Sequence, residues 1–334
     1  HPQAKACSAD AARVLAEAAR AAGAPDGAIQ VIEEPNIPLL EKLMGDERVD
    51  LIVATGGPSV VKAAYRSGNP AIGVGPGNAP AVVDDSADIG LAARRIVTSK
   101  SFDNSILCTN ESAVLAFGTI AGRLLDAMRA EKAHVCSAEE TEKLRALLFT
   151  ETGFNAAMIG KDASLIAREA GFNAPGALIL VTPVTLVQPE EKLVREKLCP
   201  VLAFARVQNI DQAISSARSM MRKSGKGHSA AIHSRTEANI MAFAAAVPAL
   251  RIAVNAGCSL GVRNFASGTI VPINVAIATA STSNEYVDIL GFTTFRITSM
   301  DSNAVYGYAI SGVYADMNDP ALRRGQVARL VPWS

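Results

Sequence analysis

The first 84 residues alternate between helically spaced apolar positions and short apolar runs. Alanine, leucine and valine recur at helical spacing between Ala4 and Ala22, and Gly23 follows them as a helix stop. Leu51-Ile52-Val53-Ala54 is a continuous apolar run, which is typical of a strand buried on both faces of a parallel sheet. The pattern predicts helices over residues 4–22, 36–44 and 60–67, and strands over 28–32, 51–54 and 70–74.

The same alternation continues to about residue 265. It predicts helices over residues 84–98, 119–130, 138–149, 162–170, 211–222 and 236–245, and strands over 113–117, 156–160, 177–181, 200–205, 230–232 and 251–254. Alternating helices and buried strands indicate βαβ units in a doubly wound sheet. A chain of 334 residues has room for two such α/β domains. We expect their boundary near residue 84, and a less regular tail over 266–334.

Composition and charge exclude several classes of function. Lys+Arg and Asp+Glu both count 32, so no basic face is implied, and aromatic residues are only 5%. This argues against a nucleic-acid partner. No apolar run reaches membrane length, so we expect no membrane partner.

The five cysteines are widely spaced and include no C-x-x-C pair, and the four histidines form no H-E-x-x-H. This pattern favours neither a disulfide framework nor a zinc site, and it fits a reducing cytoplasm. We therefore predict no metal ligands.

Two glycine-rich turns fall at the ends of successive predicted strands. Thr55-Gly56-Gly57 precedes a predicted helix, whose free N–H groups and dipole suit a phosphate. Gly75-Pro76-Gly77-Asn78 follows the next strand. Glycines that only permit tight turns and a ligand-lined edge of the sheet both explain this pattern. The G-x-G-x-x-G dinucleotide fingerprint does not open this section.

The stretch from Phe102 to Glu111 carries one cysteine, Cys108, at the end of a short apolar run. Small and amide-bearing residues precede it, and polar residues follow. A reactive thiolate needs such a reachable position with nearby donors. A lone cysteine is nevertheless more often a buried small hydrophobe than a nucleophile.

Several motifs in fixed order connect these observations. They are His1-Pro2, Ala54-Thr55-Gly56-Gly57-Pro58, Lys62-Ala63-Ala64-Tyr65, Gly73-Val74-Gly75-Pro76-Gly77-Asn78, Ser101-Phe102-Asp103-Asn104 with Cys108, Glu196-Lys197-Leu198-Cys199-Pro200 and Gly227-His228. Together they resemble the CoA-acylating branch of the aldehyde dehydrogenase superfamily. The chain is similar to the aldehyde half of bifunctional alcohol/aldehyde dehydrogenases and to acylating propionaldehyde, acetaldehyde and sulfoacetaldehyde dehydrogenases.

The resemblance implies two Rossmann-like, doubly wound α/β domains. Residues 1–84 would be the C-terminal part of the cofactor-binding domain, and 85–265 the catalytic domain with the nucleophilic cysteine. Residues 266–334, including Gly291-Phe292-Thr293-Thr294-Phe295, would return to the cofactor domain or form a subunit interface. The chain starts at His1 without Met, so we expect that an N-terminal part is missing.

The resemblance also implies roles for individual residues. Cys108 would be the nucleophile, and Glu196 would bind the nicotinamide ribose, although a surface glutamate is the simpler interpretation of Glu196 alone. Thr55, Gly56 and Gly57 match the turn beside the cofactor pyrophosphate. Gly75 and Gly77 lie in the turn that corresponds to E-L-G-G-K of hydrolytic relatives. The catalytic acid of that turn is absent here, so the thioester would be left for CoA instead of water.

Two further residues follow from the same comparison, with alternatives left open. His228 would act near the thiol end of the site in CoA transfer, or be a structural histidine. Asn104 would orient or donate near the reacting carbonyl, or only cap its turn. Of the remaining histidines and cysteines, Cys7, His134, Cys136 and His233 are interpreted as structural or surface residues.

The resulting hypothesis is an oxidoreductase that converts a small aldehyde, NAD or NADP, and CoA to acyl-CoA and NAD(P)H. The resemblance implies a homo-oligomer (dimer or tetramer) in the cytoplasm or in a bacterial microcompartment. A reductase of an activated acyl group is a second enzyme hypothesis. A catalytically silent or incomplete fragment with a structural or assembly role is the alternative from another class.

Overall fold

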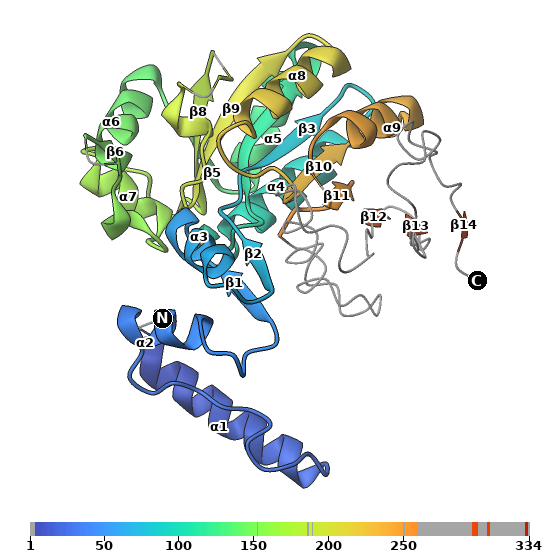
Figure 1. Ribbon diagram of the computed structural model, residues 1–334. Helices are drawn as coiled ribbons and strands as arrows, with labels where there is room; N and C mark the ends of the chain where they lie inside the picture. The colour runs from blue at the N-terminus through green and yellow to red at the C-terminus, as the bar shows by residue number, and fades with distance from the viewer. Residues whose placement is uncertain are drawn as a thin grey trace. The chain divides into compact units, whose positions relative to one another are not determined.

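The computed structural model describes residues 4–151, 153–185, 187–188, 190–249, 251–259, 296–299, 306–307 and 331–332 (Figure 1). The chain divides into two compact units, His1–Gly73 and Val74–Ser334. Each is described by itself below. Among the described residues, none of the helices is long and apolar enough to cross a membrane.

The first unit contains three helices and a small sheet. Its elements are α1 (Lys5–Ala21), α2 (Ile37–Met44), β1 (Ile52–Thr55), α3 (Pro58–Arg66) and the pairing partner of β1, β2 (Ala71–Val74). The Asn36 side chain accepts a hydrogen bond from Leu39 N–H at 2.9 Å and begins α2 as an N-cap. The core is small because the described sheet has two strands. It consists of Met44, Ile52, Ala54, Ala64 and Ala71.

Two predictions for this unit are wrong. Residues 28–32 form no strand; Ile29 and Val31 are 39% and 40% exposed, and no described strand pairs with this run. β1 is not buried on both faces, because Ile52 and Ala54 are buried while Val53 is 60% exposed. An apolar run alone does not specify how many faces of a strand are covered.

The second unit is built on an eight-stranded sheet with the order β12-β11-β10-β3-β4-β9-β8-β5, in which every neighbouring pair is parallel. The strands are β3 (Ala79–Val83), β4 (Glu111–Phe117), β5 (Ala133–Val135), β8 (Ile179–Val184), β9 (Val201–Val207), β10 (Ser229–His233), β11 (Arg251–Val254) and β12 (Arg296–Ser299). Short antiparallel pairs are formed by β6 (Phe149–Thr150) with β7 (Gly153–Phe154) and by β13 (Tyr306–Gly307) with β14 (Val331–Pro332).

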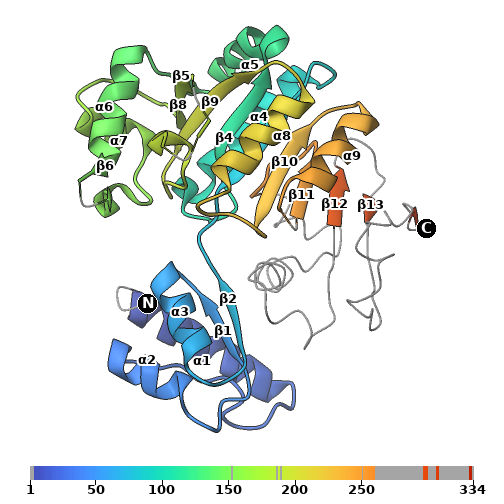
Figure 2. The same cartoon turned by 45° about the horizontal axis from the view of Figure 1, so that its top comes forward.

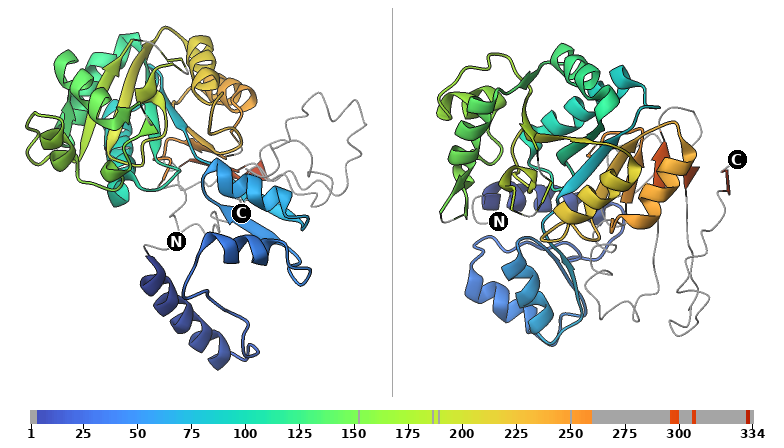
Figure 3. Two further views of the ribbon diagram at one scale, coloured as in Figure 1. Left: turned by 60° about the vertical axis from the view of Figure 1, so that its left-hand side comes forward. Right: turned by 90° about the horizontal axis from the view of Figure 1, so that it is seen from above.

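Helices connect these strands. They are α4 (Ile89–Ser101), α5 (Gly118–Ala130), α6 (Ala138–Leu148), α7 (Ala163–Glu169), α8 (Ile210–Met220) and α9 (Glu237–Ala246), with 3₁₀ turns η2 (Phe102–Ser105), η3 (Ala156–Met158) and η4 (Lys192–Val194). The connections that contain α4 and α5 lead to strands that lie nearer the β5 end of the sheet. Those that contain α8 and α9 lead to strands nearer the β12 end. Right-handed crossovers therefore place α4 and α5 on one face and α8 and α9 on the other (Figures 2 and 3).

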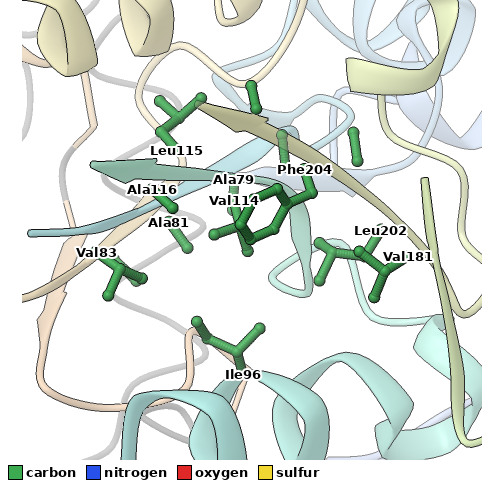
Figure 4. Packing of buried hydrophobic residues seen from close by; sticks show 14 of the residues in the cluster. Ala79, Ala81, Val83, Ile96, Val114, Leu115, Ala116, Val181, Leu202 and Phe204 are labelled. Atoms are coloured by element: carbon green, nitrogen blue, oxygen red, sulfur yellow. The ribbon is translucent and has the colours of Figure 1, made fainter. Parts of the chain in front are cut away.

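The main core lies between the central strands and these helices. Val114 of β4 pairs with Phe204 of β9, and Ile96 of α4 points toward the strands from below in Figure 4. All three side chains are at most 2% exposed. Because the side chains of this core are closely packed, they fix the positions of the strand ends and of the loops at those ends.

Three differences from the predicted layout concern the second unit. Residues 156–160 form no strand; η3 occupies 156–158, and the Asn155 side chain caps it by accepting from Ala157 N–H at 3.2 Å. β3 and β5 were not predicted. Because β3 pairs with β4 and β10, the structural boundary follows Gly73 instead of residue 84. The assignment of the two parts to cofactor binding and catalysis stays a prediction. The tail lies outside the described residues except for β12, β13 and β14.

Candidate active site

Four loops of the second unit meet at the amino edge of its parallel sheet. The register pairs Ala79 of β3 with Glu111 of β4, and Ala81 of β3 with Ala231 of β10. Because β4 also pairs with β9, the segments that precede these four strands lie side by side. They carry Gly77, Cys108, Glu196 and His228. This is opposite to the carboxyl edge at which open α/β sheets generally bind ligands.

Cys108 lies half-buried in the turn between η2 and β4. The Asn110 side chain holds this turn to the end of α4 by donating to Ser99 O at 2.8 Å. Asp103, Asn104 and Ser105 have φ values of 51°, 47° and 62°, so three consecutive non-glycine residues are left-handed. Left-handed backbone costs about 1–2 kcal/mol per residue for most side chains, so tertiary contacts must hold this turn.

Gly77 lies directly against the backbone of Cys108. A Cβ atom on Gly77 would lie 1.9 Å from the Cys108 carbonyl oxygen and 3.0 Å from Glu196 Oε1. The Gly77 N–H donates to the same Oε1 at 2.9 Å. A residue with a side chain cannot occupy this position without moving one of its neighbours. Gly75 is different, because a Cβ atom there would meet nothing within 4 Å.

The ionisable groups around Cys108 have shifted pKa values. Burial raises the pKa of the Cys108 thiol, and the nearby Glu196 carboxylate adds to that rise, while Arg251 acts in the opposite direction. Burial also raises the pKa of Glu196 to about 7, against the lowering effects of the Gly77 N–H and the ammonium of Lys100. The thiol is therefore protonated at neutral pH, and Glu196 is divided between its two protonation states.

A buried lysine anchors the segment that carries Glu196. The Lys197 Nζ donates to the carbonyl oxygens of Ser112 at 3.2 Å, Leu193 at 2.5 Å and Arg195 at 2.8 Å. Burial lowers its pKa well below the usual range. Since the three carbonyls come from β4 and from the η4 region, Lys197 holds the neighbouring Glu196 backbone at the sheet edge.

His228 is a buried histidine at the start of β10. It is 1% exposed, and neither ring nitrogen has a hydrogen-bond partner among the described residues. Burial, reinforced by the positive charge of Arg251, lowers its pKa to about 4. The ring is thus a neutral imidazole at pH 7, with one nitrogen free to accept a proton.

Several residues at this edge were not predicted from the sequence. Buried Arg251 influences the pKa of both Cys108 and His228, and it donates to Ser229 Oγ at 3.1 Å and to the carbonyl oxygen of Cys258. Fully buried Glu111 accepts hydrogen bonds from Cys258 N–H at 2.6 Å and Ser99 Oγ at 2.7 Å. Their only sequence signal is a charged residue at the start of an otherwise buried strand.

The side-chain amide of Asn104 donates to a neighbouring loop. Its Nδ2 donates to Gly160 O at 3.1 Å and to Asp162 Oδ1 at 3.0 Å. The side chain thereby ties the left-handed turn to the loop before α7. These contacts reach a different loop, so they are not a local cap of the turn, and the role of Asn104 in the reaction stays a prediction.

Thr55, Gly56 and Gly57 belong to the first unit. Gly57 is the N-cap of α3, with Pro58 at the first helical position. A Cβ atom on Gly57 would meet nothing within 4 Å, and one on Gly56 would meet only Val60 at ordinary contact distances from 3.5 Å. The turn therefore offers accessible backbone N–H groups at a nine-residue helix, which is a setting that suits a phosphate.

Each unit, taken by itself, has residues whose chemistry suits part of a dinucleotide. A carboxylate such as Glu196 accepts hydrogen bonds from ribose hydroxyls, and the α3 turn suits a pyrophosphate. Gly75 has open space beside its Cα, because a Cβ atom there would meet nothing within 4 Å.

Comparison with known proteins identifies the family of this chain. The sequence profile of the aldehyde dehydrogenase family matches residues 4–269. The chain belongs to the aldehyde dehydrogenase family. The resemblance and the α/β fold predicted from the motifs are confirmed.

Similar proteins are known in sequence and in structure. An aldehyde-alcohol dehydrogenase of Clostridium acetobutylicum is 37% identical over 265 residues, covering 78% of this chain and 30% of that protein. An acetylating aldehyde dehydrogenase of Geobacillus thermoglucosidasius is 39% identical with a TM-score of 0.76, covering 78% of this chain and 58% of that one. A Rhodopseudomonas palustris propionaldehyde dehydrogenase, solved with CoA and an acylated cysteine, is 29% identical with a TM-score of 0.73, covering 79% and 60%. The chain therefore spans only part of the length of each.

Proposed function

We propose that this protein oxidises a small aldehyde to acyl-CoA, with Cys108 as the nucleophile and NAD or NADP as hydride acceptor. The carrying observation is that the Gly77 backbone lies against both the Cys108 carbonyl and the Glu196 carboxylate, at an edge that also holds His228. The acetylating names of the relatives, and the acylated cysteine beside CoA in one of them, support the same chemistry.

The first step is attack of Cys108 on the aldehyde carbonyl. Because the thiol is protonated at neutral pH, its proton must leave as the C–S bond forms. Glu196, with its pKa near 7, and neutral His228 are two groups at this edge that could accept it. The product is a thiohemiacetal on Cys108. A bound nicotinamide supplies the acceptor for the hydride that this carbon loses, and Cys108 is left as a thioester.

The second step regenerates the free thiol of Cys108. The sulfur of CoA attacks the thioester carbonyl, the bond to Cys108 breaks, and acyl-CoA is released while Cys108 regains a proton. We propose that His228 accepts the proton of the CoA thiol, because its ring nitrogens have no hydrogen-bond partner among the described residues. The turn 73–78 contains no acid that could activate water in competition.

The remaining predicted residues have supporting roles in this proposal. Glu196 holds ribose hydroxyls, while Thr55, Gly56 and Gly57 hold the pyrophosphate, and Gly75 leaves room beside the backbone. Asn104 is a positioning residue, because its amide is occupied by Gly160 and Asp162. Residues 1–73 would then contribute to cofactor binding and the second unit to catalysis. A homo-oligomer (dimer or tetramer), in the cytoplasm or a microcompartment, belongs to the same proposal.

The test is NADH formation from acetaldehyde or propionaldehyde and NAD, with and without CoA, monitored by absorbance. We expect continuous NADH formation only with CoA, and its loss in Cys108→Ala by at least about 10³-fold. Cys7→Ala is the matched control, because Cys7 is exposed on α1. Full acyl-CoA formation by Cys108→Ala would contradict the assignment of the nucleophile.

Two other outcomes would also overturn the proposal. Equal, continuous NADH formation without CoA would indicate the hydrolytic branch. Absence of NADH from a folded chain under both conditions, repeated with NADP, would favour a catalytically silent role.

A further inference from the structure

A second group of reactive side chains lies at the opposite edge of the sheet. His134 is on β5, the last strand of the sheet order, and Cys136 follows the carboxyl end of that strand. Glu140 is in the first turn of α6, which begins two residues later. One ligand atom of each residue, imidazole nitrogen, thiol sulfur and carboxylate oxygen, lies within 4.8 Å of the others.

Hydrogen bonds and ring stacking hold the Glu140 and His134 side chains and the backbone of Cys136. Glu140 completes a capping box, in which its Oε2 accepts from Ser137 N–H at 2.8 Å. The same oxygen is 3.1 Å from His134 Nε2, and the His134 ring stacks on Phe172 with centroids 5.7 Å apart. The Cys136 N–H donates to Val181 O at 2.9 Å, which fixes the cysteine backbone beside β8.

This set of donors matches the preferences of one class of ion. Zn²⁺ takes cysteine sulfur, histidine nitrogen and carboxylate oxygen in tetrahedral sites, whose donor atoms are about 3.3–3.6 Å apart. Because the donors lie within 4.8 Å of one another, they are at most about 1.5 Å farther apart than in such a site. His134 and Glu140 side chains are 28% and 22% exposed, so solvent can deliver the ion and a fourth, water ligand.

We propose that His134, Cys136 and Glu140 form a binding site for Zn²⁺ or a divalent ion of similar softness, with water as the fourth ligand. The site is separate from Cys108 and does not depend on the proposed activity. Its effect would be to clamp the start of α6 to the edge strand β5.

Binding of the metal ion would release a proton from the Cys136 thiol. Burial, with the negative charge of Glu140 as a second cause, raises the pKa of Cys136 to about 12. The thiol therefore carries its proton in the metal-free protein and loses it to solvent when the sulfur binds the ion. Glu140 is already ionised, because the Ser137 N–H and His134 lower its pKa more than burial raises it.

The experiment uses Co²⁺ as the probe, because a Co²⁺–thiolate bond gives a charge-transfer absorption band. The starting protein is the full chain with Cys7→Ser and Cys108→Ser, which removes the two cysteines that are not buried. We expect a thiolate-to-cobalt band at one equivalent, displaced by one equivalent of Zn²⁺, and a rise in Tm with Zn²⁺. Adding Cys136→Ser should abolish both signals.

Glu140→Gln is the matched variant, because glutamine keeps the capping-box hydrogen bond but is not an anionic ligand. We expect its metal-free Tm to be close to that of the starting protein and its Co²⁺ affinity to fall by about 10–100-fold. Circular dichroism verifies that each variant is folded. Absence of the band in the folded starting protein, or a band that survives Cys136→Ser, would overturn the proposal.

Discussion

The backbone of Gly77 lies so close to Cys108 that a Cβ atom on Gly77 would be 1.9 Å from the Cys108 carbonyl oxygen. The two residues are brought together because β3 and β4 pair in parallel with Ala79 opposite Glu111. Glycine is therefore required at position 77 by close approach. Its N–H also donates to Glu196, so one backbone unit contacts both the Cys108 loop and the carboxylate.

This contact predicts a difference between two neighbouring glycines. Gly77→Ala should lower the free energy of unfolding by about 1–3 kcal/mol, because the methyl group must displace the Cys108 backbone. Gly75→Ala should change it by less than about 0.5 kcal/mol, because a Cβ atom there meets nothing within 4 Å. Urea unfolding of both variants measures the difference. Equal unfolding free energies of the two variants would show that the loops of Gly77 and Cys108 move apart at little cost.

The buried carboxyl of Glu196 predicts a pH dependence of stability. Its pKa in the folded protein is about 7, raised by burial from 4.5. Between these values the native state binds more protons than the unfolded state, so stability falls as pH rises from about 4.5 to 7. The loss is at most about 3 kcal/mol, at 1.36 kcal/mol for each pKa unit.

Glu196→Gln isolates this contribution, because glutamine keeps an acceptor for the Gly77 N–H but does not titrate. We expect the decrease in unfolding free energy between pH 5 and pH 8 to be smaller in the variant than in the wild type. Glu139→Gln is the control, since the Glu139 side chain is 78% exposed, and it should leave the decrease unchanged. A decrease of the same size in Glu196→Gln would show that other groups cause it.

Much of the fold was predictable because local patterns agree with the final structure. The buried runs at 113–117 and 251–254 became β4 and β11, and the Asn36 cap begins α2 as expected. β3 was missed because Pro80 and the preceding glycine-rich turn do not resemble a central strand. The register shift between Ala79 and Pro80 explains how the sheet accommodates this proline.

The sequence indicated only those candidate site residues that lie in a family motif. Cys108 and Glu196 followed from the family resemblance, and the structure places them around Gly77. The charge of Arg251 near Cys108 depends on strand order, which a single sequence does not reveal. Likewise, His134 and Glu140 meet only because α6 starts directly beyond β5.

The left-handed turn before Cys108 predicts a difference between two variants of Asn104. Both Asn104→Ala and Asn104→Gly remove the hydrogen bonds to Gly160 and Asp162. Only alanine also strains the backbone at φ 47°, so Asn104→Ala should be less stable than Asn104→Gly by about 1 kcal/mol.

A positioning role for Asn104 adds a second readout. The rate at which iodoacetamide alkylates Cys108 should change in both variants, because both release the turn. Measuring this rate by intact mass, with Cys7→Ser as background, separates positioning from stability. An unchanged rate in Asn104→Gly would mean that the side chain does not position the cysteine.

The His228 ring has no hydrogen-bond partner among the described residues, which predicts the half of the proposed reaction that it serves. If it accepts the proton of the CoA thiol, His228→Asn should leave acylation of Cys108 nearly intact and slow the transfer to CoA by about 10²–10⁴-fold. Acylation is measured as a stoichiometric burst of NADH in rapid mixing without CoA, and transfer as steady-state NADH formation with CoA. Because the pKa of His228 is about 4, its neutral form, and hence its contribution to turnover, should persist from neutral pH down to about pH 5. A burst that slows as much as the steady state would place His228 in thiol activation or in support of the loop instead of in CoA transfer.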